Sequence, residues 1–286
     1  MATSVNFDRQ YRLIAGKAGG NGFEIGTPEN GHPLHISFAF QKSDLTTQNT
    51  GRVSIWNLNK QHLSVIESKD CVVSLSAGYG TRISQIFTGV VTHAVTTIDN
   101  ADRRTEVELV DNLIEVRDTY VAVSYNGVVN WKKIFDDVAG QMGVVISYAY
   151  NVEFASVSNG FSFVGQAKNI LTKGCDCCGL TWSLQNGIIQ IKRPGDTMSR
   201  EVYLLSSDTG LIGIPARVSE AASGENKTSL LGWDVEYLLN GAINIDDYVK
   251  LESNIVTGYF RVYSLEISGD NVSGDWICRA RLLEVD

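Results

Sequence analysis

The sequence is poor in proline and in basic charge. It has 4 proline residues among 286, beside 27 glycines, a balance that suits many tight turns. Acidic residues outnumber basic residues by 32 to 24, which gives a formal net charge of −8. A surface that binds DNA or RNA normally carries a basic patch, so this balance argues against sequence-specific nucleic-acid binding. It would suit a surface past which DNA moves without sticking, although mild acidity also serves plain solubility.

Targeting segments are also missing from the sequence. The first twenty residues, MATSVNFDRQYRLIAGKAGG, contain no apolar stretch of the kind that a secretory signal needs. No apolar run approaches the roughly 18–20 residues of a membrane helix, so we expect no membrane anchor. The cysteines, odd in number, are then expected to be reduced thiols of a protein made in a cytosol. They are Cys71, Cys175, Cys177, Cys178 and Cys278.

Catalytic motifs are absent as well. The sequence has no HExxH, GxSxG or SxxK arrangement suited to metal-assisted or nucleophilic catalysis. The glycine-rich segment Gly16–Gly22 lacks the features of a phosphate-binding loop, because Lys17 is followed by Ala18 and no helix follows. His93 is expected to be an ordinary structural histidine. We therefore expect no enzyme activity, no cofactor and no catalytic residue. The remaining histidines, which show no partner pattern, are His32, His35 and His62.

Three pairs of carboxylates were weighed as acid–base or metal sites. Glu106 and Glu108 are two apart in an alternating strand, so both lie on the same outward face, where like charges normally stay hydrated. A glycosidase needs carboxylates opposed across the scissile bond. The adjacent pairs Asp136-Asp137, on the solvent side of a helix, and Asp246-Asp247, at a turn, are not framed for metal binding.

The most unusual local feature of the sequence is a cluster of three cysteines, Cys175, Cys177 and Cys178. A structural zinc site usually takes four ligands from two separated pairs. Here three cysteines lie within four residues and no histidine is near. On a helix Cys175 and Cys178 continue the face of Leu171, while Cys177 points elsewhere. We expect packing rather than metal binding, since free cysteine behaves as a small hydrophobe.

The first 118 residues are expected to form a β domain with one helix. Strands are predicted over 5–14, 22–40, 51–56 and 72–77, and a long strand over 83–98 returns as 105–110 after a turn at 99–102. A short helix is predicted over 58–69, capped by Asn57 or Asn59. One helix packed on local hairpins makes a compact α+β module.

The next 80 residues change character, because amphipathic helices replace alternating strands. Apolar residues at positions 131, 134, 135, 138 and 142 mark one face of a helix that ends at Gly143. A strand over 144–150, a second helix over 166–178 and a hairpin around Asn186-Gly187 follow. From about 201 the chain is again β-rich, with a polar loop over 219–228. Strands are predicted there over 202–205, 230–237, 248–252, 258–267 and 276–284.

Several stretches carry a resemblance to the baseplate hub proteins of contractile-tailed bacteriophages. In the first β domain they are VSIWNLNKQHLSVIE, VVSLSAGYG and QIFTGVVT, and the order of their elements carries the likeness. The segment NILTKGCDCCGLTWSLQNGIIQIKRPG is similar to the middle domain of that family. Two further stretches, GAINIDDYVKLES and TGYFRVYSLEISGDNVSGDWICRARLLE, resemble the last strands of hub proteins.

The resemblance implies a β-rich α+β fold with two tube-like β domains, 1–118 and 201–286, flanking a middle α+β domain, 119–200. It implies a structural virion component, a homotrimeric baseplate hub that adapts a sixfold tail tube to a threefold spike. The implied partners are the tail tube or tube-initiator protein, the spike and other baseplate proteins. Without a further C-terminal extension, a fused lytic or spike domain is not expected in this chain.

Other functions stay open at this point. The same part in a phage-derived contractile injection system would have the same sequence features. A tail-associated glycan hydrolase would need opposed carboxylates. A glycan-binding protein could use tryptophans as sugar platforms, but each lies in an alternating strand where burial is the common fate. These tryptophans are Trp56, Trp182, Trp233 and Trp276.

Overall fold

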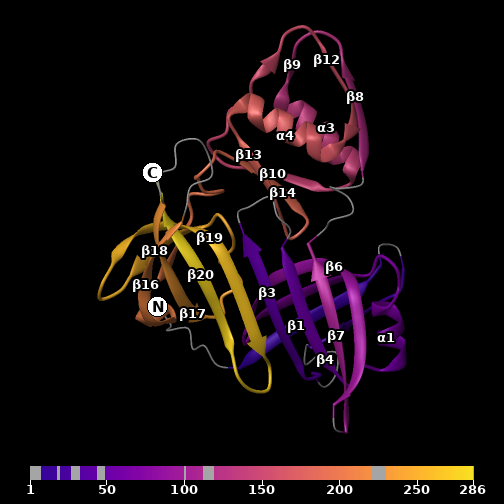
Figure 1. Cartoon of the computed structure of the whole chain (residues 1–286), viewed down its shortest axis with the longest axis vertical. Coiled ribbons are helices and arrows are strands. Elements are labelled where there is room, and N and C mark those ends of the chain that lie inside the picture. The colour runs from indigo at the N-terminus through magenta and orange to yellow at the C-terminus, as the bar shows by residue number, and fades with distance from the viewer. Residues whose placement is uncertain are drawn as a thin grey trace.

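Strands dominate the computed structural model, which describes residues 8–17, 20–26, 33–43, 49–99, 101–111, 119–220 and 230–285 (Figure 1). Its main feature is a 13-stranded sheet, and a smaller part with two helices lies beside it. The β-rich α+β class expected from the sequence is confirmed. Among the described residues, no helix is long and apolar enough to cross a membrane.

The described residues of the N-terminal β region form seven strands and one helix. They are β1 (Arg9–Gly16), β2 (Gly22–Ile25), β3 (Ile36–Ser43), β4 (Thr50–Trp56), α1 (Lys60–Ile66), β5 (Val72–Tyr79), β6 (Arg82–Asp99) and β7 (Asp102–Val110). The single strand predicted over 22–40 is wrong, because β2 and β3 are separate strands that pair with different neighbours. Of the two predicted caps, Asn59 is the one that accepts a hydrogen bond, from the backbone N–H of His62 at 2.8 Å.

The C-terminal β region contains six strands and one 3₁₀ turn. They are β15 (Val202–Leu205), η2 (Ser207–Thr209), β16 (Leu211–Glu220), β17 (Leu230–Leu238), β18 (Tyr248–Glu252), β19 (Thr257–Asp270) and β20 (Trp276–Glu284). Strand β16 was not predicted, and the predicted loop over 219–228 lies almost wholly outside the described residues.

The two β regions share one strand order. In the N-terminal region the order is β3-β4-β7-β6-β5-β1, and in the C-terminal region it is β16-β17-β20-β19-β18-β15. Taken in chain order, β1 and β3 to β7 therefore correspond one by one to β15 and β16 to β20. Three differences remain among the described residues. Strand β1 pairs antiparallel with β5, whereas β15 pairs parallel with β18; β2, which pairs with β1, has no counterpart; and α1 has no helical counterpart.

Local irregularities recur at corresponding places in the two regions. Strand β6 carries one extra residue, Thr92, against β7, and β19 carries one extra residue, Tyr263, against β20. An aspartate with positive φ precedes the corresponding strands β5 and β18, namely Asp70 (φ 61°) and Asp246 (φ 67°). Because a non-glycine residue seldom takes this conformation, its recurrence at equivalent points indicates two copies of one structural unit.

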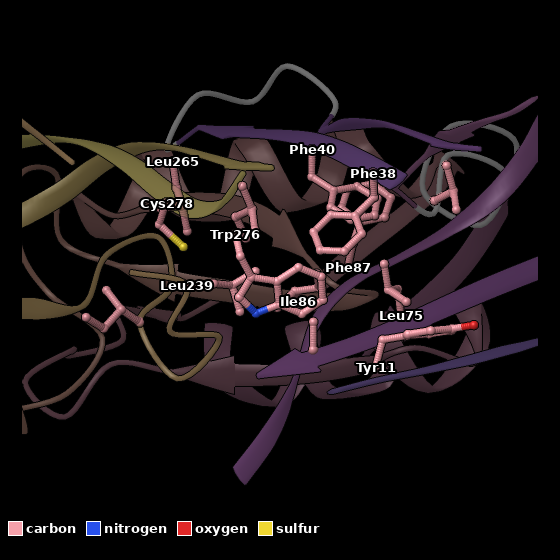
Figure 2. Close-up of a cluster of buried hydrophobic side chains, with 14 of the residues drawn as sticks. Tyr11, Phe38, Phe40, Leu75, Ile86, Phe87, Leu239, Leu265, Trp276 and Cys278 are labelled. Carbon is pink, nitrogen blue, oxygen red and sulfur yellow. The ribbon is translucent and has the colours of Figure 1, made fainter. Parts of the chain in front are cut away.

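The two β regions are joined by strand pairing. Strand β19 runs antiparallel to β3 from Ser264 opposite Ser43 to Asp270 opposite Ser37, so the sheet is continuous from β16 to β2. Their buried apolar side chains form one core, which takes residues from between Tyr11 and Leu109 and from between Leu205 and Leu282. Figure 2 shows this shared core, in which Phe38 meets Trp276 edge-on with ring centroids 5.3 Å apart.

A second hydrophobic core belongs to the middle part. Its elements are β8 (Tyr120–Tyr125), β9 (Val129–Asn130), α3 (Trp131–Met142), β10 (Val145–Tyr148), β11 (Ser156–Val157), β12 (Phe161–Gln166), α4 (Ala167–Cys178), β13 (Thr181–Gln185) and β14 (Ile188–Lys192). The predicted helix 131–142 is confirmed, with Gly143 ending it in the left-handed conformation at φ 69°. The second predicted helix, 166–178, begins one residue later, at Ala167.

The apolar stripe of α3 packs inside the middle part and not into the β core. Trp131, Phe135 and Met142 all belong to the second cluster, together with Leu171 and Cys175 of α4. In Figure 1 the two helices lie between β8, β9 and β12, which are farthest from the large sheet, and β10, β13 and β14, which lie nearer to it. The three-domain division predicted from the sequence remains a prediction. The separate core of the middle part supports its boundaries, whereas the two β regions share one core.

Candidate assembly surface

The surface of the large sheet opposite the β core carries ordered charges. Arg52 of β4 binds both predicted outward carboxylates of β7, with Nε 3.3 Å from Glu106 and Nη2 3.0 Å from Glu108. Arg104 also binds Glu106, at 3.1 Å. Both glutamates lie on one outward face, as the sequence predicts, with side chains 30% and 44% exposed, and arginines pair with them there.

The corresponding charges in the C-terminal region are inverted in sign. By register, Arg52 opposite Glu108 corresponds to Asp234 opposite Arg281. Arg281 donates two hydrogen bonds to Asp234, from Nε at 2.8 Å and from Nη2 at 3.0 Å, and Arg279 binds Glu236 at 2.8 Å. The two units therefore keep a cross-strand ion pair at one position but exchange acid and base. The exchange keeps both faces near neutrality, and a face of this kind suits a wall that holds neither sign of charge strongly.

A buried carboxylate fixes the middle part to the N-terminal β region. Asp111 follows β7 and is 2% exposed. Its two oxygens accept hydrogen bonds from the backbone N–H groups of Asn186 at 2.9 Å and Gly187 at 3.1 Å, and from the Asn49 amide at 3.1 Å. The Asn-Gly hairpin turn predicted from the sequence is thus also the contact point between two parts of the chain. Burial raises the pKa of Asp111, and these donors oppose that rise.

A second buried charge cluster fixes the middle part to the C-terminal β region. Asp246 is fully buried and lies 2.8 Å from Nζ of Lys192 and 2.6 Å from Nη1 of Arg261. Lys192 ends β14 of the middle part, whereas Arg261 belongs to β19. The sequence placed Asp246 at an ordinary turn, and only the tertiary structure shows that two distant cations surround it. Breaking a buried group of this kind normally costs several kcal/mol.

A third buried group lies between the two β regions. Nζ of Lys42 in β3 lies 3.3 Å from Oδ1 of Asn244, in the loop before β18. Burial lowers the pKa of Lys42 to about 8, and the nearby charge of Asp111 opposes this shift. Burial likewise raises the pKa of Asp247 to about 6. Strand β3 thus inserts a cation into a pocket made by β19 and the loop ahead of β18.

Two of the strand edges without a partner among the described residues belong to β16 and to the second half of β6. Strand β16 pairs only with β17, and it carries a three-residue bulge, Gly213–Pro215, opposite Val235. The second half of β6, beyond Val90, pairs only with β7. In the C-terminal unit the corresponding half of β19 is covered by β3. Unpaired edges of this length are sites where another strand can add.

The cysteine cluster is dispersed by its helix. Cys175 is buried in the middle core, Cys178 is half-buried and Cys177 is exposed. Burial raises the pKa of Cys175 to about 12, so its thiol stays protonated. Over the described ranges, no group of three potential ligands is placed to hold a metal ion. That the cysteines are reduced and metal-free remains a prediction, for elemental analysis to test.

The remaining candidates occupy separate places. Nε2 of His35 lies 2.9 Å from a carboxylate oxygen of Asp270, which the sequence did not reveal as a partner because it is 235 residues away. The His35 ring also stacks on Trp56, with ring centroids 3.9 Å apart. His93 is exposed beside the β6 bulge, and the ordinary structural role expected for it stays a prediction. His32 lies outside the described residues. Trp276 is buried in the β core. The half-buried tryptophans, which lie on different parts of the chain, are Trp56, Trp182 and Trp233.

The resemblance implies two tube-like β domains, and the sequence also holds a weak signal of this repetition that was not recognised. The pattern Asp-x-x-Val-x-Leu occurs at 70–75 and again at 246–251. In both copies the aspartate has positive φ and the valine and leucine are buried in the shared core. Three matching positions in six carry too little information to be noticed without the structure.

Comparison with solved structures identifies the fold. A 43 kDa tail protein of prophage MuSo2 from Shewanella oneidensis superposes with a TM-score of 0.62 at 11% identity, over 97% of each chain. A tail protein from Neisseria meningitidis MC58 gives 0.59 at 10% identity, again over 97% of each chain. The chain has the fold of phage tail proteins. The resemblance found in the sequence is thereby confirmed.

A third solved structure comes from a secretion machine. It is the Escherichia coli c3393 protein, described as a component of the type VI secretion system with structural similarity to T4 tail proteins gp27 and gp5. The TM-score is 0.58 at 10% identity, over 89% of this chain and 74% of that one. No family profile and no curated protein matches the sequence. The comparisons therefore establish a fold shared by tail proteins.

Proposed function

We propose that this chain is the central hub of a phage tail baseplate, a homotrimer that joins the tail tube to a trimeric spike. One observation carries the proposal: the chain contains two β units with the same strand order, the same bulge and the same left-handed aspartate. Three copies then present six similar units to a sixfold tube while keeping threefold symmetry for the spike.

The ordered, sign-balanced charges on the sheet surface support a channel wall. On this surface Arg52, Arg279 and Arg281 are paired with carboxylates at 2.8–3.3 Å, so these three cations are not free to hold DNA. DNA that passes such a wall would be neither held by excess cations nor repelled by a strong single-sign field. The protein would carry out no covalent chemistry, would reside in the virion baseplate and would be made in the host cytoplasm.

A second reading places the same trimer in a phage-derived injection machine. The likeness to a type VI secretion component favours it, because that likeness is nearly as close as those to the phage tail proteins. The two readings share one assembly and differ in what passes through the channel. A glycan hydrolase is less well supported, since Glu106 and Glu108 are neighbours on one face and bound by arginines.

Electron microscopy of the chain, alone and co-expressed with its tube and spike proteins, tests the proposal. We expect a ring with three identical subunits, six lobes and a central channel, with beyond about 2,000 Å² buried between copies if the assembly is permanent. A monomer of the chain alone is compatible with the proposal if the ring forms once both partners are present. A dimer, a ring of another number, or a monomer that stays monomeric with both partners would contradict the proposal. A zymogram that clears peptidoglycan would overturn the non-enzymatic role.

A further inference from the structure

The unpaired half of β6 corresponds to a half-strand that is already covered elsewhere in the same chain. Matching the two bulges places Ala94, Val95, Thr96 and Thr97 of β6 where β19 has Leu265, Glu266, Ile267 and Ser268. In β19 these four residues stand opposite Lys42, Gln41, Phe40 and Ala39 of β3. In β6 the equivalent edge faces no strand among the described residues, and Val95 is 41% exposed.

Strand β16 is the counterpart of β3, and it too has a free edge. Its residues Ala216, Arg217, Val218 and Ser219 face β17 as Ala39, Phe40, Gln41 and Lys42 face β4. The bulge at Gly213–Pro215 lies just outside these four residues, so the regular part of β16 is free to pair. Within the chain, β3 pairs with β19 at the junction of the two β regions. The corresponding strands β16 and β6 do not pair with each other, and each has an unpaired edge among the described residues.

A groove beside β6 matches the pocket that β3 fills at its junction with β19. It encloses about 490 Å³ and is lined by the loop Glu67–Asp70 and by β6 from Val90 to Ala94. The corresponding loop before β18 receives Lys42 of β3 through Asn244. Corresponding backbone bonds close both loops, from Val91 N–H to Cys71 O at 2.8 Å and from Val262 N–H to Asp247 O at 3.1 Å. At β6 no strand of the described residues lies beside the groove.

Within the trimer proposed above, on which this step rests, we infer that β16 of one copy adds antiparallel to β6 of the next. The repeat dictates the register: Ala94 opposite Ser219, Val95 opposite Val218, Thr96 opposite Arg217 and Thr97 opposite Ala216. The second copy is the occupant because the strand that fits this edge belongs to the same chain. The interface is heterologous, and repeating it closes a ring of alternating units with no free edge at these strands.

The chemistry of the two junctions differs in a way that fits their roles. At the junction within the chain, Phe40 and Ile267 stand opposite each other in the buried core. Between copies the corresponding residues are Thr96 and Arg217, and both are exposed in the single chain. Because Arg217 takes the position of Phe40, its guanidinium lies on the side of the sheet where Glu67 and Asp70 border the groove. A polar seam lets each copy fold and stay soluble before it assembles.

Disulfide trapping tests the register. In a Cys177→Ser background, which removes the exposed native thiol, the double variant Val95→Cys, Val218→Cys places two cysteines directly opposite across the seam. Opposed positions of an antiparallel pair are close enough for a disulfide with small backbone shifts. We expect mild oxidation of the assembled ring to link each copy to the next, giving covalent dimers and trimers on a non-reducing gel.

Matched controls separate this inference from the proposed function. Val95→Cys with Leu204→Cys uses an exposed side chain on β15, a strand outside the seam, and should give no trimer ladder. A trimer by light scattering or microscopy without the Val95–Val218 link would overturn the strand pairing and leave the hub function standing. Equal linking in the control would overturn the register. A chain that neither trimerises with its tube and spike partners nor links would overturn both.

Discussion

Single buried charges connect the three parts of this protein, and one of them makes its stability depend on pH. Burial raises the pKa of Asp247 to about 6 in the folded chain, against 3.8 for an ordinary aspartate. Between about pH 4 and 6 the folded state therefore binds more protons than the unfolded state. The free energy of unfolding should fall as the pH rises through this window, by up to about 3 kcal/mol.

The variant Asp247→Asn should lose this dependence, because asparagine keeps an acceptor for the Asn244 N–H, 2.7 Å away, without titrating. Urea unfolding at half-unit steps from pH 4 to 7 measures the effect. The difference between variant and native protein should grow in favour of the variant as the pH rises. The exposed Asp275, changed to Asn, serves as a control and should shift no profile. A difference that stays constant with pH would contradict the prediction.

At the scale of elements, close approach of the two helices of the middle part depends on a glycine. A Cβ atom at Gly174 of α4 would lie 2.5 Å from Cε1 of Phe135 and 2.6 Å from Cε3 of Trp131 in α3. Both rings are buried in a packed core and have little room to move. We expect Gly174→Ala to cost about 1–3 kcal/mol through overpacking.

Gly140 of α3 provides the matched control. A Cβ there meets nothing within 4 Å, and its backbone is helical. Gly140→Ala should therefore raise stability by about 0.5–1 kcal/mol, because alanine favours the helix. Thermal or urea unfolding of the middle part measures both variants. Equal effects of the two substitutions would show that helix propensity, and not helix packing, dominates at both sites.

At the scale of the whole molecule, the two β regions should persist without the middle part. Replacing residues 119–200 by a glycine–serine linker leaves the continuous sheet and the shared β core intact. It removes Lys192, but Asp246 keeps Arg261 and forms a neutral pair. Asp111 loses the hairpin turn and becomes accessible to water. We expect a folded β protein with one cooperative unfolding transition.

Circular dichroism and calorimetry of the deletion variant measure this outcome. The isolated fragment 119–200, which has its own core, is the complementary control and should fold with its two helices. Two separate transitions in the deletion variant would show that the β regions do not depend on each other. An unfolded deletion variant beside a folded fragment would show that the middle part is needed to hold the β regions together.

Local signals were enough to predict much of the secondary structure. The apolar stripe from Trp131 to Met142 bounds α3, the Asn186-Gly187 dipeptide forms its hairpin, and the long alternating run after Gly80 is β6. These features depend on residues a few positions apart, where periodicity and turn chemistry act directly. The strand over 22–40 was misassigned and β16 was missed, because glycines and a proline bulge obscure their alternation.

Long-range partners were decided only by the tertiary structure. His35 meets Asp270, and β3 meets β19, across more than 200 residues of chain, and Asp246 meets Lys192 of the middle part. No local pattern predicts which carboxylate pairs with which cation, because the pairing depends on how the strands of the whole sheet are arranged. The sequence alone determined a β-rich chain with a helical insertion and a likeness to tail proteins. The repetition of one strand order, and with it the free edges available for assembly, came only from how the strands pair in space.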